Sequence, residues 1–152
     1  MGLKDRISED LKAAMKSGDK LRLETVRTLR AALLEKEIEQ RGEGPGMTAE
    51  DELTALTGAA KKRKEAIEQY RLGGRPELAE QEEKELAIIQ EYLPRQLTDD
   101  EITLIVREAV AQSGASGAGD FGKVMPLVMK QVKGRADGKV VQTIVKKTLG
   151  VA

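Results

Sequence analysis

The chain has 152 residues and carries 26 basic and 26 acidic side chains, so its formal net charge of zero gives no general attraction to nucleic acid or to an anionic membrane. Its length suits one domain or two small lobes. Because it contains neither Cys nor His, it excludes a disulfide, a Cys nucleophile, a Ser-His-Asp triad and the usual zinc sites. We therefore predict no metal site and no cofactor, and we assign no catalytic residue.

The composition predicts an all-α fold, because good helix formers dominate and only one Phe and two Tyr are present. Four amphipathic patterns precede residue 94, and their apolar faces include Met15, Leu34 and Ile38. Breaks are expected at Gly18-Asp19, in the Gly/Pro-rich segment 42–46 and at Gly73-Gly74. Thr48 is expected to cap the third helix, and Pro76 suits the first turn of the fourth. These patterns predict a four-helix, bundle-like N-terminal domain at residues 1–94.

Three further helices are expected after residue 98. Thr98 and Glu101 fit a capping box, and Asp120 and Asp137 are candidate caps for the next two helices. Pro126 lacks an N–H, so we expect the sixth helix to start late or to kink. Segment 113–119 is rich in Gly, Ala and Ser and is expected to be a flexible connector. Residues 98–152 are therefore predicted to form a small three-helix C-terminal lobe.

The overall charge balance hides a basic C-terminal segment. Residues 120–152 hold seven basic and two acidic side chains, and lysines recur at i, i+7 and i+8 beside the apolar stripes. Glycines between the sixth and seventh expected helices would let a phosphate approach the backbone and the N-terminus of the seventh helix. With so few aromatic rings, any RNA must be recognised by its shape and phosphates. The candidate nucleic-acid-binding residues are Lys123, Lys130, Lys133, Gly134, Arg135, Gly138, Lys139, Lys146 and Lys147.

Each charged cluster also has a plain structural interpretation. The C-terminal lysines can form a solvated face, with Gly134 ending one helix and Asp137 capping the next. The basic run 61–64 precedes Glu65 and Glu68, which are spaced for pairing on a helix surface. The acidic run 80–85 spreads around a helix with nothing obvious to bury it, so we expect surface charge there.

Several motifs resemble one family. They are Ala13-Ala-Met-Lys-Ser-Gly-Asp-Lys20, Val26-Arg-Thr-Leu-Arg30, Glu68-Gln-Tyr70 with Gly74-Arg-Pro76, and Tyr92-Leu-Pro-Arg-Gln-Leu97 running into Asp99-Asp-Glu-Ile102. Together with Phe121-Gly-Lys-Val-Met125 and Lys133-Gly-Arg-Ala-Asp-Gly-Lys-Val140, they resemble the YqeY-like proteins over essentially the whole chain. The last two motifs are similar to the C-terminal domain of the B subunit of the tRNA-dependent Asp/Glu amidotransferase. Pro126 departs from that pattern.

This resemblance implies a helical bundle followed by a lobe of the kind that engages tRNA in the amidotransferase and extends some glutaminyl-tRNA synthetases. Lys123, Lys133, Arg135 and Lys139 are the residues that the matching motifs carry over. The glutaminase and kinase-like sites of the larger enzyme lie outside the matching segment. The implied partners are tRNA and an aminoacyl-tRNA synthetase or amidotransferase subunit.

Three functions therefore stay open. The first is a non-catalytic tRNA-binding accessory module linked to tRNA-dependent amidation or aminoacylation. The second is a component of a carbon-nitrogen ligase that uses glutamine as amido-N donor, and the third is a helical protein-interaction module. The sequence shows no apolar run near the roughly 18 residues that span a bilayer and no signal-like N-terminus. We expect a soluble cytoplasmic protein with no membrane partner.

Overall fold

The computed structural model describes residues 2–42, 44 and 46–150. The chain divides into two compact units, Met1–Leu93 and Pro94–Ala152. All the regular secondary structure of the described residues is helical, which confirms the all-α prediction. Each unit encloses an apolar core of its own.

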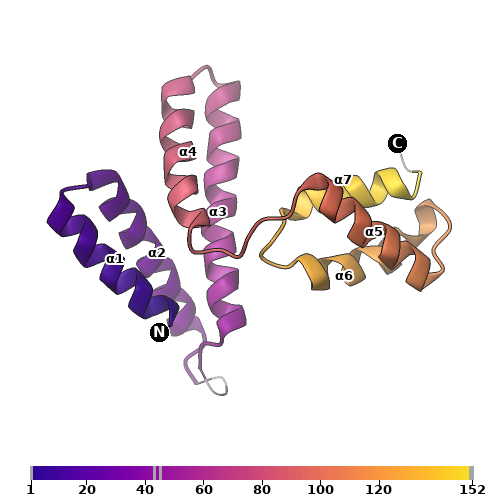
Figure 1. The fold of residues 1–152 in the computed structure, drawn as a ribbon, viewed down its shortest axis with the longest axis horizontal. Helices are drawn as coiled ribbons and strands as arrows, with labels where there is room; N and C mark the ends of the chain where they lie inside the picture. Colours follow the sequence, from indigo (N-terminus) through magenta and orange to yellow (C-terminus); the bar gives the residue numbers. More distant parts are fainter. Residues whose placement is uncertain (1, 43, 45, 151–152) are drawn as a thin grey trace. The chain divides into compact units, whose positions relative to one another are not determined.

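The first unit contains two helical hairpins (Figure 1). Helices α1 (Leu3–Ser17) and α2 (Lys20–Glu39) form one hairpin, and α3 (Ala49–Leu72) and α4 (Pro76–Gln90) form the other. Helix α2 contacts both α3 and α4, so it joins the two hairpins. The buried core between them consists of Ile7, Val26, Leu29, Leu33, Leu56, Ala60, Ile89 and Tyr92.

The expected helix ends of this unit are confirmed. Gly18 follows α1 with a φ of 74°, a left-handed conformation that favours glycine. Thr48 caps α3, with its hydroxyl oxygen accepting a hydrogen bond from the Asp51 N–H at 3.2 Å, and Pro76 is the first residue of α4. Segment 42–46 is a loop at its described glycines, whereas the predicted loop positions Glu43 and Pro45 lie outside the described residues.

Three side chains assigned to apolar faces are exposed instead. Met15 is 58% exposed, Leu34 is 50% exposed and Ile38 is 51% exposed. On α2, the neighbouring Leu33 is only 1% exposed, because consecutive residues of a helix point about 100° apart. The apolar arc of α2 is therefore wider than the surface that the other helices cover.

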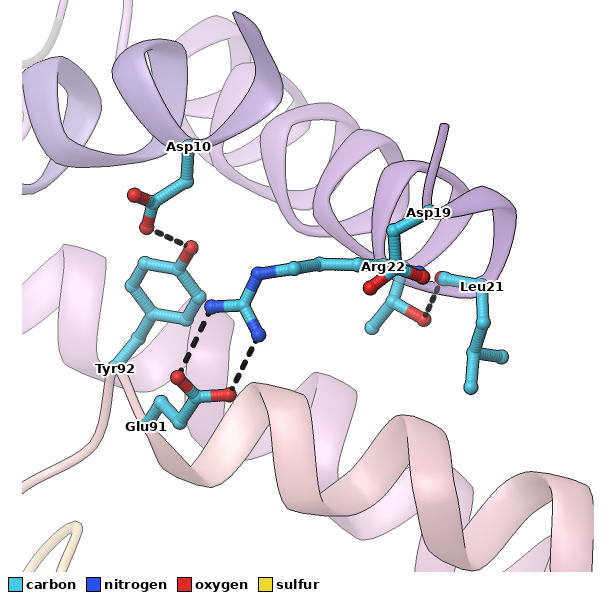
Figure 2. A network of polar contacts seen from close by, with 7 residues as sticks. Asp10, Asp19, Leu21, Arg22, Glu91 and Tyr92 are labelled. Carbon is cyan, nitrogen blue, oxygen red and sulfur yellow. Dashed lines mark hydrogen bonds and ion pairs between the residues drawn. The ribbon is translucent and has the colours of Figure 1, made fainter. Parts of the chain in front are cut away.

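A polar network holds α1, α2 and the end of α4 together (Figure 2). The Arg22 guanidinium donates to both carboxylate oxygens of Glu91, at 2.9 and 3.0 Å, and the Tyr92 hydroxyl donates to the Asp10 carboxylate. The Arg6 guanidinium lies 5.3 Å from the centroid of the Tyr92 ring. Burial, followed by the hydrogen bond to Asp10, raises the pKa of the Tyr92 phenol above its usual value. Tyr92 thus bonds the segment that follows α4 to α1.

The second unit packs three helices against one another. Helices α5 (Asp99–Ser113), α6 (Phe121–Val132) and α7 (Gly138–Thr148) share contacts pairwise, and a short 3₁₀ helix, η1 (Ala118–Asp120), precedes α6. Its core is made largely of valine, with Ile102, Val106, Ala109, Val124, Val128, Val132, Val141, Val145 and Leu149 buried. These small side chains suit a lobe built from short helices.

The caps of the second unit follow the sequence in two cases out of three. Thr98 and Glu101 form the predicted capping box, and the Asp137 carboxylate accepts the Lys139 N–H at 3.0 Å. Asp120 occupies the residue before α6, but its carboxylate accepts the Ser116 N–H at 2.9 Å and makes no cap bond to α6. It closes the preceding turn instead.

Of the two alternatives expected for Pro126, the late start is wrong, because the sixth helix begins at Phe121 and contains Pro126. The carbonyl that loses its partner belongs to Gly122, which is exposed, so water can bond to it. Segment 113–119, predicted as a flexible connector, is packed in part, because Ala115 contacts the core and η1 begins at Ala118.

Candidate nucleic-acid interface

The buried apolar faces of α6 and α7 determine the directions in which the lysines of these helices point. Val124 and Val128 face the core from α6, which places Lys123 and Lys130 together on an exposed side two turns apart. On α7, Lys139 and Lys146 likewise share one side. Lys147 follows Lys146 and therefore points about 100° away from it. The lysines of α7 therefore lie on more than one side of that helix and do not form one flat face.

The start of α6 meets the last turns of α7 at Phe121. The Lys146 ammonium lies 5.8 Å from the centroid of the Phe121 ring, within the range of a cation–π contact. Lys123 lies near Asp120, whose pKa is lowered mainly by the Ser116 N–H and further by the Gly117 N–H and the Lys123 charge. Two lysines from different helices are therefore held at this end of the lobe.

The turn between α6 and α7 is bonded to the segment that precedes α5. The Gln96 side-chain amide donates to the Gly134 carbonyl at 3.0 Å, and the Leu97 N–H donates to the Arg135 carbonyl at 2.7 Å. Gly134 is buried and has a φ of 76°. The expectation that Gly134 gives a phosphate open access is therefore wrong, and the left-handed conformation accounts for the glycine.

Arg135 is half-buried and lies near the acidic start of α5. The Thr98 N–H lowers the pKa of the Glu101 carboxyl most, followed by the Arg95 guanidinium, and Arg135 adds to the effect. The Arg95 Nη1 atom is 3.1 Å from a Glu101 carboxylate oxygen. Part of the positive charge of Arg135 thus acts on the Glu101 carboxylate of the same protein. Lys133 and Lys139 are exposed, and Gly138 is half-buried at the start of α7.

The lysines of α6 and α7 face few negative charges. Within the described part of the chain, no ion pair involves Lys123, Lys130, Lys139, Lys146 or Lys147. Asp137 is the only acidic residue between positions 121 and 149, and its carboxylate caps α7. This arrangement leaves a positive surface suited to phosphate groups.

The charged runs of the first unit behave differently. Arg63 of the basic run lies 3.4 Å from Glu82 and 3.5 Å from Glu85 on α4, so its partners come from a neighbouring helix and not from the following turn of α3. The acidic run is also not purely surface charge, since Glu85 is only 8% exposed. Burial raises the pKa of the Glu85 carboxyl, Arg63 opposes the shift, and Glu82 and Glu24 reinforce it. Helical spacing within one segment could not reveal these partners.

No group of three or more Asp, Glu, His or Cys that could hold a metal ion occurs in the described ranges. Among the same residues, no helix is long and apolar enough to cross a membrane.

A model of the Yqey-like protein family matches residues 4–149. The chain belongs to the YqeY-like family. It is 31% identical over 149 residues to "Altered inheritance of mitochondria protein 41, mitochondrial" of Pyrenophora tritici-repentis, a match covering 95% of this chain and 80% of that protein. An uncharacterized protein of Schizosaccharomyces pombe is 38% identical over 88 residues, which is 58% of this chain and 69% of the relative.

A shorter match links this YqeY-like chain to the Lachancea thermotolerans protein that shares the Pyrenophora protein's name. It is 36% identical over 87 residues, covering 57% of this chain and 46% of that relative. The matching region is thus less than half of the Lachancea protein. The family membership rests on the family model over residues 4–149 and on the Pyrenophora match, which covers 95% of this chain. The names of the Pyrenophora and Lachancea relatives describe inheritance of mitochondria for those proteins.

Proposed function

We propose that this YqeY-like protein is a non-catalytic tRNA-binding accessory module that acts beside tRNA-dependent amidation or aminoacylation. The observation that carries the proposal is the set of five lysines on α6 and α7 that make no ion pair within the described residues. Folded RNA presents phosphates on several sides, so it can engage lysines that lie on two helices and do not form one flat face.

The structure changes which residues are the best candidates for phosphate contact. Lys139 and Lys146 share one side of α7, and Lys123 and Lys130 share one side of α6. Gly134 is buried and is no longer included as a contact. Arg135 is a weaker candidate because it lies near Glu101. Two pairs of lysines, one on each helix, therefore define the proposed interface.

The test is a titration of the full chain with folded, unmodified tRNA at several salt concentrations. Each neutralised phosphate contributes roughly 0.7–0.9 to the slope of log affinity against log salt, so about three to five contacts give a slope of roughly −2 to −4. The variant Lys123→Ala/Lys130→Ala/Lys139→Ala/Lys146→Ala should bind far more weakly and show a flatter slope. Circular dichroism should show unchanged helix content.

The matched control is Lys61→Ala/Lys62→Ala, which removes two exposed cations from α3. This control should bind tRNA as the native chain does. If it abolishes binding while the four-lysine variant binds normally, the proposed interface is wrong. A native chain that binds tRNA with no dependence on salt would also contradict the proposal.

The compartment belongs to the same proposal. The sequence predicts a cytoplasmic protein, whereas two of the relatives described above are named as mitochondrial. We keep the cytoplasm as the proposed location of this chain, and immunoblotting of cell fractions tests it directly.

A further inference from the structure

The strongest unassigned surface lies on α2, far along the chain from the lysines of α6 and α7. Leu34 and Ile38 are half exposed there, at 50% and 51%. Together with the exposed Arg27 and Ala31 they follow a four-three-four spacing, the spacing of a seam that packs against another helix. We call Arg27, Arg30, Ala31, Leu34 and Ile38 the α2 strip.

The cations of the α2 strip have no acidic partners. Arg27 and Arg30 are exposed, and no ion pair within the described residues involves either of them. Both belong to the segment that carries the family resemblance, Val26-Arg-Thr-Leu-Arg30. The strip thus combines apolar surface with uncompensated positive charge.

Within the described residues, none of the carboxylates of α2 forms an ion pair with Arg27 or Arg30. Glu37 forms an ion pair with Lys4 at 2.7 Å, and Glu39 pairs with Lys36 at 3.6 Å. Glu35 lines a groove of about 280 Å³ between α2 and α3, and Glu24 raises the pKa of Glu85 on α4. The positive charge of the strip is therefore not neutralised by its own helix.

This charge distribution decides which occupant fits. An RNA strand would satisfy the arginines but would gain little from Leu34 and Ile38, since its backbone is polar. A second copy of α2 would bring apolar side chains but only one exposed, unpaired carboxylate beside the seam, Glu35, against two arginines on each copy, so positive charge would stay in excess. A helix with an apolar seam flanked by carboxylates satisfies both the leucine and isoleucine side chains and the arginines.

We propose that the α2 strip is a docking surface for an acidic amphipathic helix of a partner protein. Leu34 and Ile38 insert between the apolar side chains of the partner helix, and Arg27 and Arg30 pair with its flanking carboxylates. This surface lies in the unit Met1–Leu93, so it does not depend on the proposed tRNA interface on α6 and α7.

The experiment uses a designed, fluorescently labelled helical peptide of about 21 residues, with Leu at the seam positions and Glu at the flanking positions. Fluorescence anisotropy should show that the native full chain binds it. Leu34→Ser/Ile38→Ser and, separately, Arg27→Glu/Arg30→Glu should each weaken binding roughly tenfold or more, since each pair contributes to one half of the recognition.

Two controls make the result specific. Leu72→Ser removes an apolar side chain that is 82% exposed on α3, and this variant should bind the peptide normally. A peptide with Lys in place of Glu should bind the native chain much more weakly. The Arg27→Glu/Arg30→Glu variant leaves the apolar residues intact, so it tests the surface even if the serine variant folds poorly.

The proposal is overturned if the acidic peptide does not bind, or if it binds the native chain and both strip variants equally. It is also overturned if the strip variants abolish tRNA binding while peptide binding is unchanged, because the strip would then be an RNA surface. Sedimentation could also show that the native chain is a dimer and that Leu34→Ser/Ile38→Ser dissociates it. That result would identify a second copy as the occupant of the α2 strip and would reject the proposed acidic partner helix.

Discussion

The two units of this protein use charge in opposite ways. In the first unit, ion pairs join different helices: Lys4 to Glu37, Arg22 to Glu91, Arg63 to Glu82 and Arg71 to Glu83. In the second unit, Arg95 pairs with Glu101, six residues further along the chain, and no ion pair within the described residues involves Lys123, Lys130, Lys139, Lys146 or Lys147. Charges in the first unit therefore contribute to the fold, whereas most lysines in the second unit stay available to a ligand.

The cores differ as well. Leu29, Leu33 and Leu56 dominate the first core, whereas valines from α5, α6 and α7 fill most of the second. Buried leucine contributes more apolar area than valine, so the first unit has the larger hydrophobic stabilisation for each core residue. Because each unit has its own core, we expect the free energy of unfolding of each unit to depend on its own core residues.

The largest effect is expected from Leu29→Ala, because Leu29 is fully buried in the first core. Removing its side chain should destabilise the first unit by about 2–5 kcal/mol. In calorimetry, one unfolding transition should shift to lower temperature while the other stays in place. A single transition that shifts as a whole would show that the units Met1–Leu93 and Pro94–Ala152 unfold together.

Arg63→Ala should have the next largest effect. It leaves Glu82 and Glu85 side by side on α4 without their cation, and partly buried charges of this kind destabilise a fold by roughly 1–3 kcal/mol when they lose a partner. Lys130→Ala, which removes an exposed cation of α6, should change stability by less than about 0.5 kcal/mol. Urea unfolding measures the loss in free energy of unfolding for both variants. An equal loss for Arg63→Ala and Lys130→Ala would contradict the difference between the charges of the two units.

Tyr92→Phe should destabilise the first unit by roughly 1–2 kcal/mol, because it removes a hydrogen bond to a carboxylate.

The raised pKa of Tyr92 also gives a pH dependence. The folded state holds the phenolic proton more tightly than the unfolded state, so this contribution is full below the usual value of about 10 and declines as pH rises above it. Urea unfolding between neutral and strongly alkaline pH should show the decline in the native chain and much less of it in Tyr92→Phe. Tyr70→Phe, at a half-exposed tyrosine, is the control for removal of a hydroxyl and should change stability at neutral pH by less than about 0.5 kcal/mol.

The smallest effect is expected from Lys146→Ala. Its contact with the Phe121 ring is partly exposed, so its loss should reduce stability by about 0.5–1 kcal/mol at most. Lys146→Arg keeps both the cation and the contact and should be close to neutral. Loss of more than about 2 kcal/mol in Lys146→Ala would mean that Lys146 is structural and would weaken its assignment to the RNA interface.

The helices and most of their ends could be predicted from the sequence, because these features depend on residues close together in the chain. Thr48, Thr98 and Asp137 cap helices through backbone groups two or three residues away. Pro76 starts α4 for a similarly local reason. The family resemblance could also be recognised from the sequence, because it lies in short motifs. The match of the family model over residues 4–149 confirms it.

The tertiary structure alone decided which charges and apolar side chains are used. Arg22 and Glu91 are 69 residues apart and Tyr92 and Asp10 are 82 apart, so no local spacing could pair them. The burial of Gly134 depends on Gln96, and the exposure of Leu34 depends on which sides of α2 its neighbours cover. Periodicity gives the direction of a side chain around its own helix, but only the packing of other helices determines whether that direction leads to a core, an ion pair or an open surface.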